Sequence, residues 1–318
     1  MRIVALVPGG IGDQILFFPT LDDLKRYYPD AEIDVVVEPR AQGAYRVCKS
    51  VADVLRFDFK NRNSLTEWVD LIGNIRDREY DVAISLEQRW FIGLLLWLTG
   101  VSVRIGYQGR ANLFFTNWVE LKTEQYAAAM YHDLLKGLGI TSPCPELAIN
   151  VPKTDIDWVE AEQKRLGIKD GYVLIHGGYS QITQDNGVDG IYPTQNWQQI
   201  IQQFQQRQPD VPLVVLQGPD NEQLAQSLYG SNPNIKVTSP GDVGKIAAMI
   251  AGANLMLCTE GASMQLAVAV QTYTIALFGS KDPKKLLPVS DRFIPINSST
   301  SKMKDIPSQD VLERVCGS

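Results

Sequence analysis

Short apolar runs alternate with longer helical stretches along the whole chain, and this alternation limits the possible folds more than any other feature. Continuous apolar runs joined by helices are typical of a parallel sheet that is covered on both faces. We therefore predict an α/β fold made of doubly wound parallel sheets. In the first half, the predicted strands are residues 3–7, 33–37, 54–57, 82–85 and 103–105, and the predicted helices are residues 21–28, 65–78, 91–98 and 126–138.

A second series of strands and helices begins after a stretch that contains Pro143, Pro145 and Pro152. A chain of 318 residues is long enough for two domains that each bury a core. We therefore predict two doubly wound α/β domains, residues 1–150 and 151–318. The predicted strands of the second domain are residues 172–176, 213–217, 235–237, 255–258 and 274–278.

The helix after the first of these strands has the clearest pattern. Thr194 is a suitable N-cap, and Trp197, Ile200 and Phe204 follow at helical spacing on one face. Most of the other positions are Gln, so the opposite face is polar and uncharged.

The charge balance bears on the partner of the protein. The chain has 30 Lys and Arg residues against 36 Asp and Glu residues, which gives a net charge of −6. A protein that binds a bare phosphate backbone needs an excess of positive charge. Nucleic acid is therefore not expected as a partner.

The cysteines indicate a reducing compartment. They are far apart and form no C-x-x-C pair, so neither a zinc site nor a dense disulfide framework is expected. The apolar run at the N-terminus, before Pro8, is too short for a signal peptide. We expect reduced thiols in a cytoplasmic protein. The four positions are Cys48, Cys144, Cys258 and Cys316.

The longest apolar run, residues 90–101, falls short of the roughly 20 residues that span a bilayer. Its first part, residues 90–97, has two interpretations. It is either a buried helix or a face that docks on a membrane. The second interpretation gives the protein a peripheral contact with the inner face of the plasma membrane.

The first predicted strand ends in a glycine-rich loop, Pro8-Gly9-Gly10-Ile11-Gly12-Asp13, before a helix. Glycines allow a tight turn, and the amides that open a helix attract anions. Asp13 is either an ordinary carboxylate at a helix start or a general base.

A dinucleotide fingerprint is an alternative for this loop, because Gly10-x-Gly12 follows a strand and Glu38 ends the next one. The third glycine position, however, is Ile15, and Asp13 would bring negative charge to the pyrophosphate. An NAD-dependent oxidoreductase therefore remains only a third hypothesis.

Three loops follow predicted strands of the second domain. One contains His176, Gly177 and Gly178, the next runs from Gln217 to Glu222, and the third runs from Glu260 to Ser263. Carboxyl ends of parallel strands meet at one edge of the sheet, where ligands bind. The backbone amides at the start of the helix that follows the third loop suit a diphosphate. A carboxylate at this place accepts hydrogen bonds from sugar hydroxyls. Each loop is alternatively an ordinary turn.

Several stretches, taken in order, resemble glycosyltransferase family 9, the heptosyltransferase-like enzymes of lipopolysaccharide assembly. The resemblance implies a GT-B fold, with two Rossmann-like domains that face an interdomain cleft and bind acceptor and donor respectively. It also implies transfer with inversion, without metal or cofactor. The stretches are MRIVALVPGGIGDQILFFPTLDDLKRYYPDAEIDVVVE, VRIGY, IHGGYS, QGPDNE and TEGASMQLAVAVQTYTIALFGSKDP.

Carried over residue by residue, the resemblance makes Asp13 the general base in a loop with Gly10 and Gly12. The donor, with ADP as the expected nucleotide, is expected at residues of the second domain. Arg89, Arg104 and Arg110 are candidates for the acceptor, although each is alternatively a surface residue. The donor residues are Gly177, Gly178, Ser180, Gln195, Gln217, Gly218, Glu222, Glu260, Gly261, Ala262, Ser263 and Gln265.

Two positions depart from the family pattern. Gln195 stands where the family has Lys, and Gln265 stands where it has His. Both changes remove positive charge from the expected leaving-group site, and Lys281 and Lys284 are candidates to compensate. The leading hypothesis is an inverting transferase of a heptose-like sugar to a lipopolysaccharide-type or other cell-envelope glycan. The alternative is a non-catalytic sugar-nucleotide or glycan-binding protein on the same fold.

Overall fold

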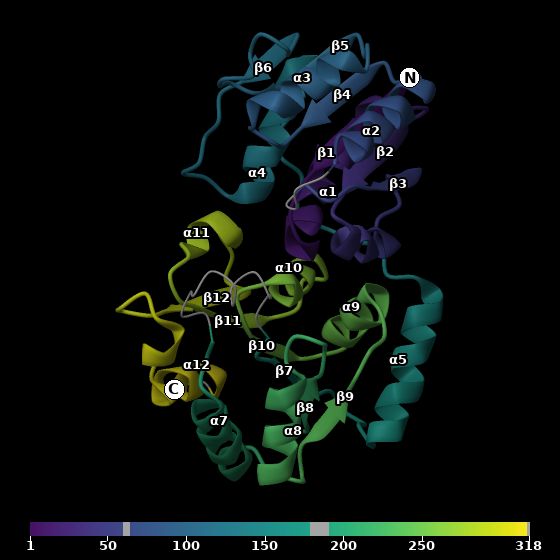
Figure 1. Ribbon diagram of the computed structural model, residues 1–318. Coiled ribbons are helices and arrows are strands. Elements are labelled where there is room, and N and C mark those ends of the chain that lie inside the picture. The colour runs from purple at the N-terminus through teal and green to yellow at the C-terminus, as the bar shows by residue number, and fades with distance from the viewer. Residues whose placement is uncertain (60–63, 179–190, 317–318) are drawn as a thin grey trace. The chain divides into compact units, whose positions relative to one another are not determined.

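The computed structural model describes residues 1–59, 64–178 and 191–316, and the chain forms two compact units, Met1–Asn150 and Val151–Ser318 (Figure 1). Each unit contains one six-stranded, wholly parallel sheet with helices on its faces. The predicted α/β class with two doubly wound parallel sheets is confirmed.

The sheet of the first unit has the strand order β3-β2-β1-β4-β5-β6, the Rossmann order. The chain reverses direction across the sheet between β1 and β4, so the loops after these strands lie at the switch point where such folds bind ligands. The strands are β1 (Arg2–Val7), β2 (Glu32–Val37), β3 (Asp53–Arg56), β4 (Val82–Ser85), β5 (Val103–Tyr107) and β6 (Asn117–Val119).

Helices of the first unit pack in two groups. Helix α1 contacts η1 and α4, whereas α2 contacts α3 over the core that includes Leu71, Ile75, Ile92 and Leu96. The helices are α1 (Ile11–Tyr27), the 3₁₀ helix η1 (Pro39–Val47), α2 (Leu65–Asp77), α3 (Trp90–Leu98), α4 (Ala127–His132) and the 3₁₀ helix η2 (Asp133–Leu138).

The second unit repeats the same topology. Its strand order β12-β11-β10-β7-β8-β9 places β10 and β7 at the switch point, as β4 and β1 are in the first sheet. The strands are β7 (Val173–His176), β8 (Leu213–Leu216), β9 (Lys236–Thr238), β10 (Leu255–Thr259), β11 (Thr274–Phe278) and β12 (Phe293–Asn297).

Helices cover both faces of this sheet. Helix α7 contacts α8 and α12, and α9 contacts α5 and α10. The helices are α5 (Lys153–Leu166), α7 (Thr194–Arg207), α8 (Glu222–Ser231), α9 (Val243–Ala251), α10 (Ala262–Ala269), α11 (Pro283–Leu286), the 3₁₀ helix η3 (Met303–Asp305) and α12 (Ser308–Cys316).

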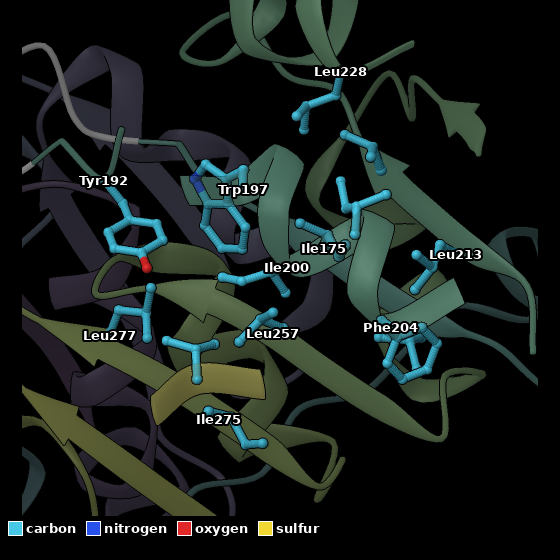
Figure 2. Close-up of a cluster of buried hydrophobic side chains, with 14 of the residues drawn as sticks. Ile175, Tyr192, Trp197, Ile200, Phe204, Leu213, Leu228, Leu257, Ile275 and Leu277 are labelled. Atoms are coloured by element: carbon cyan, nitrogen blue, oxygen red, sulfur yellow. The ribbon is translucent and has the colours of Figure 1, made fainter. Parts of the chain in front are cut away.

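The stripe predicted on α7 forms the centre of the second core. Figure 2 shows Trp197, Ile200 and Phe204 packed toward sheet residues such as Ile175. The rings of Tyr192 and Trp197 meet edge to face, with centroids 5.2 Å apart. The predicted cap was wrong, because Thr194 is already the first helical residue and Pro193 is the N-cap.

Two other local predictions were wrong. The edge strands β6 and β12 were missed, because the first is only three residues long and the second contains Pro295. The helix predicted over residues 126–138 changes at Asp133 from α4 to the 3₁₀ helix η2. There Gly137 lies against Ile105, and a Cβ at Gly137 would lie 2.6 Å from the Ile105 side chain. All four cysteines are free, as predicted.

Candidate functional site

The loop between β1 and α1 holds the carboxyl group of Asp13 against its own backbone. Asp13 Oδ2 accepts a hydrogen bond from the Gly10 amide at 2.8 Å. Gly9 has φ of +114°, and a Cβ at this position would lie 2.3 Å from Asp13 Oδ2. The loop therefore needs glycine at position 9, both for its backbone angle and for the space that the carboxyl group occupies.

Gln14, the next residue, ties this loop to the rest of the first unit. Its side chain is buried, its Nε2 donates to the Val7 carbonyl at 3.0 Å, and its Oε1 accepts from the Tyr45 hydroxyl at 2.8 Å. Both ends of the loop are thus held, which fixes the start of α1 and the half-buried Asp13.

Tyr131 of α4 faces Asp13. Its hydroxyl oxygen lies 3.5 Å from Asp13 Oδ1. Burial, with a smaller contribution from the charge and hydrogen bonding of Asp13, raises the pKa of Tyr131 well above its ordinary value. The hydroxyl is therefore neutral at physiological pH and can donate toward the carboxylate. A carboxylate that a backbone amide and a phenol help to position is suited to orient and deprotonate a hydroxyl.

The structure separates the three arginines that were candidates for the acceptor. Arg104 pairs in register with Ala83, near the amino end of β5, whereas Asp13 follows the carboxyl end of β1. Its guanidinium donates to the carbonyl groups of Phe114 and Val101. Arg89 pairs with Glu87 at 2.6 Å, and Arg110 is exposed after β5.

In the second unit, loops after three adjacent strands are joined by hydrogen bonds. The Thr259 hydroxyl at the end of β10 donates to the Gly178 carbonyl after β7 at 2.6 Å. In the first turn of α10, Ser263 Oγ lies 2.7 Å from His176 Nδ1. The predicted convergence of these loops is thus present in the described residues.

His176 also faces the third loop. Its Nε2 lies 3.8 Å from Asp220 Oδ1, after β8. Burial, the largest single influence, acts to raise the pKa of Asp220. Hydrogen bonding and charge interaction with His176, together with a backbone hydrogen bond, outweigh it, so the pKa lies below its ordinary value. A Cβ at Gly178 would lie 2.4 Å from Asp220 Oδ2, so this glycine lets the two loops approach.

A cavity of about 560 Å³ opens beside this cluster. Asn221 is fixed at its wall, since its side chain accepts from the Gly218 amide at 2.7 Å and donates to the Leu216 carbonyl at 2.8 Å. Glu222 is exposed at the start of α8 and accepts from Gln226. Residues that line the cavity include Gly177, Tyr192, Thr194, Asp220, Asn221 and Glu222.

Glu260 is an unusual group, because its carboxyl group is buried at the end of a strand. Its Oε2 forms an ion pair with Lys281 Nζ at 3.5 Å, but within the described residues this oxygen has no hydrogen-bond partner. Burial raises the pKa of Glu260, and Lys281 only partly offsets this. Gly261 follows as the N-cap of α10, with Ala262 as its first residue.

The remaining predicted donor residues differ in their positions. Gln265 is buried, and its Nε2 donates to the Leu286 carbonyl at 2.8 Å, while its Oε1 has no hydrogen-bond partner in the described part of the chain. Gln195 is exposed next to Thr194. Gln217 lines a different cavity, with Arg165 and Tyr229. Ser180 lies outside the described residues.

Sequence reasoning missed several residues of these loops. Gly9, Tyr131 and Thr259 carry contacts described above but were not among the candidates. Asp220 and Asn221 had a local signal, because Asn and Asp after Gly-Pro often bond to nearby backbone. Tyr131 had none, since its contact joins residues 118 positions apart.

The described part of the chain has neither a metal-binding cluster nor a membrane-spanning helix. Over residues 1–59, 64–178 and 191–316, no group of three or more His, Cys, Asp or Glu side chains is arranged to hold a metal ion. Over the same residues, no helix combines the length and apolar character needed to cross a membrane.

Two of the curated proteins that are similar to this chain match it over almost its whole length. One is the chloroplastic photosynthetic NDH subunit of subcomplex B 1 of Arabidopsis thaliana, 24% identical over 96% of this chain and 71% of that protein. The other is lipopolysaccharide heptosyltransferase 3 of Escherichia coli, 25% identical over 95% of this chain and 90% of that protein.

Comparison with solved structures supports the fold. The E. coli heptosyltransferase WaaC with ADP-2-deoxy-2-fluoro heptose superposes with a TM-score of 0.76 at 17% identity, over 99% of each chain. The model of glycosyltransferase family 9 (heptosyltransferase) matches residues 68–316, which is well over half of the sequence. Two Rossmann-like sheets and this match together show that the chain belongs to glycosyltransferase family 9.

Proposed function

We propose that this glycosyltransferase moves a heptose-like sugar from a nucleoside-diphosphate donor to a lipopolysaccharide-type or other cell-envelope glycan, in the cytoplasm, with inversion and without a metal. The first unit binds the acceptor and supplies the base. The second unit binds the donor. The names of two similar proteins support this choice of substrates, one a lipopolysaccharide heptosyltransferase and the other a heptosyltransferase with an ADP-heptose analogue.

The observation that carries the proposal is the buried carboxyl group of Glu260. In the part of the chain that the structure describes, Glu260 Oε2 has an ion pair with Lys281 but no hydrogen-bond partner. A buried carboxyl group of this kind reduces stability, so such groups are more common at sites that bind ligands. Glu260 lies beside the opening of α10, where amides suit a diphosphate. The carboxylate accepts hydrogen bonds from donor hydroxyls, and the amides stabilise the negative charge of the departing nucleoside diphosphate.

Asp13 acts as the general base. The acceptor hydroxyl oxygen attacks the anomeric carbon, and Asp13 takes the hydroxyl proton as the new C–O bond forms. The bond from the anomeric carbon to the phosphate oxygen breaks, and the diphosphate leaves with the electron pair. Attack opposite the leaving group inverts the anomeric carbon. Tyr131, 3.5 Å from Asp13, orients the carboxylate.

One observation favours a second candidate, a non-catalytic binding protein on the same fold. The relative from Arabidopsis is named as a subunit of a photosynthetic complex, not as a transferase. In addition, Gln195 and Gln265 replace the two positively charged or titratable groups that the family pattern has there. In this candidate the second unit keeps a nucleotide site while transfer is lost.

Calorimetric titration with ADP, UDP, GDP, dTDP and NAD tests the proposal. We expect tight binding of ADP, followed by transfer from an ADP-heptose donor to a heptose-accepting glycan. Binding of NAD alone would contradict it. Binding of a nucleoside diphosphate without transfer to any glycan acceptor would favour the binding protein.

A further inference from the structure

Helix α3 (Trp90–Leu98) has no polar side chain, yet one of its faces is exposed. Ile92, Leu95 and Leu96 are buried in the first unit. On the opposite side, Trp90 is 52% exposed and Trp97 is 54% exposed. A helix at the surface of a water-soluble domain usually carries polar residues on its outer face. The outer face of α3 therefore suits an apolar partner.

The segment after β5 extends this apolar surface. Ala111 packs on Gly93 of α3, since a Cβ at Gly93 would lie 2.9 Å from the Ala111 Cβ. Leu113, two residues on, is 87% exposed. The Phe115 ring lies over Gly106, where an added Cβ would meet it at 2.4 Å.

Strand register puts a third tryptophan on the same side. Trp118 of β6 pairs with Gly106 of β5, and residues paired across a parallel ladder point to the same face of the sheet. This is the face on which Phe115 packs in one core with α3. Trp118 is 50% exposed. We name this surface the tryptophan face, and it comprises Trp90, Leu94, Trp97, Leu98, Leu113 and Trp118.

Exposed tryptophan is concentrated here. The chain has six tryptophans, and within the described residues those that are exposed are Trp90, Trp97 and Trp118. Tryptophan is the side chain that most favours the boundary between water and lipid headgroups. The elements that carry it, α3, β5 and β6, adjoin one another in the first unit (Figure 1).

The charge of this region is opposite to that of the chain. Residues 88–119 contain Arg89, Arg104 and Arg110 and no Asp, Glu or Lys, although the whole chain has a net charge of −6. Glu87 and Glu120 flank this segment, and Glu87 pairs with Arg89, so a net positive charge remains on the segment. Arg110 is exposed beside the tryptophan face, and the Arg89 guanidinium lies over the Phe91 ring, 5.0 Å from its centroid. A positive segment in a negative protein is attracted to anionic headgroups.

We propose that the tryptophan face docks on the surface of an anionic phospholipid bilayer. The nine residues of α3 extend about 14 Å, too short to cross the bilayer, so the helix lies along the interface with its tryptophans at headgroup depth. A second copy of the chain is a poorer occupant, because a symmetric interface would bring like arginines together. The inference goes beyond the transfer reaction, since vesicle binding needs neither donor nor acceptor.

Sedimentation with vesicles tests the proposal on the full chain. We expect binding to phosphatidylcholine vesicles that contain one third phosphatidylglycerol and much weaker binding to pure phosphatidylcholine. Trp97→Ser with Trp118→Ser should lower the partition coefficient by roughly tenfold or more, and Arg110→Glu should lower it further. Tyr229→Ser removes an aromatic side chain of similar exposure, 53%, from the second unit and should change nothing.

Three outcomes would overturn the proposal. They are equal binding to both kinds of vesicle, unchanged binding by the double tryptophan variant, and self-association of the chain that the same variant abolishes. Circular dichroism confirms that each variant is folded. ADP titration of the same variants tests the proposed function separately from membrane docking. The proposed donor residues belong to the second unit, so the substitutions in the tryptophan face should leave ADP binding unchanged.

Discussion

The Ser263 hydroxyl lies 2.7 Å from Nδ1 of His176, and this contact joins the loop after β10 to the loop after β7. Both groups are buried, so loss of one leaves the other without its partner.

We predict that Ser263→Ala lowers the free energy of unfolding by about 1–2 kcal/mol, because a buried polar group that loses its partner retains the cost of desolvation. The affinity for a nucleoside diphosphate should fall as well. Urea denaturation and calorimetry measure the two effects. Ser231→Ala, which removes exposed hydrogen bonds, is the control. Unchanged stability and affinity for Ser263→Ala would mean that this contact does not hold the loops.

Gly9→Ala should displace the Asp13 carboxyl group and destabilise the first unit by about 1–3 kcal/mol. The reasons are the φ of +114° and the 2.3 Å approach of an added Cβ to Asp13 Oδ2. Gly73→Ala is a matched control, since this helical glycine has no atom within 4 Å of an added Cβ, and it should stabilise by about 0.5–1 kcal/mol. Thermal unfolding measures both. Equal effects would contradict the role of Gly9.

Glu260→Gln should separate stability from binding. Burial, partly offset by Lys281, raises the pKa of Glu260 above its ordinary 4.5, so the folded state holds this proton more tightly than the unfolded state. The stability contribution of the carboxyl group therefore decreases as the pH rises from 4.5. At pH 7 the neutral variant should be as stable as the original chain or more stable.

Binding of the donor should nevertheless weaken in Glu260→Gln, because the neutral amide is a poorer acceptor of hydrogen bonds from sugar hydroxyls. Unfolding curves at pH 5 and pH 7, together with titration of an ADP-sugar, test both parts. A variant that loses stability and keeps its affinity would make Glu260 a structural residue.

Gln195→Lys should strengthen donor binding. The side chain is exposed beside Thr194, which lines the cavity of the second unit, so a cation there gains a solvent-screened attraction to phosphate worth about two- to fivefold in affinity. Gln202→Lys places the same charge two turns further along the same helix and should have no effect. If both variants raise the affinity equally, the increase comes from the added positive charge of the protein as a whole. Position 195 then makes no specific contact with the donor phosphate.

Sequence alone predicted the loops of the second unit well, for a physical reason. Parallel strands end at one edge of the sheet, so residues that follow β7 and β10 must lie near one another. The contact of Thr259 with Gly178 realises this expectation. The doubly wound class followed from the same apolar runs, because strands buried on both faces have no polar alternation.

Contacts that depend on tertiary packing could not be predicted. The approach of Tyr131 to Asp13 requires α4 to pack on α1, which no local pattern specifies. The hydrogen bond from Arg104 to the Phe114 carbonyl likewise depends on the path of the chain between β5 and β6. The edge strand β6 has three residues, too few for a periodicity to show.

The central claim is that Asp13 is the general base of sugar transfer, and transfer by Asp13→Asn tests it most directly. Asn keeps an oxygen that accepts from the Gly10 amide, so folding and ADP affinity should be unchanged. The rate of transfer should fall by about a hundred- to ten-thousandfold. Asp22→Asn, on the same helix, should keep its activity. Turnover by Asp13→Asn at the rate of the original chain would contradict the mechanism.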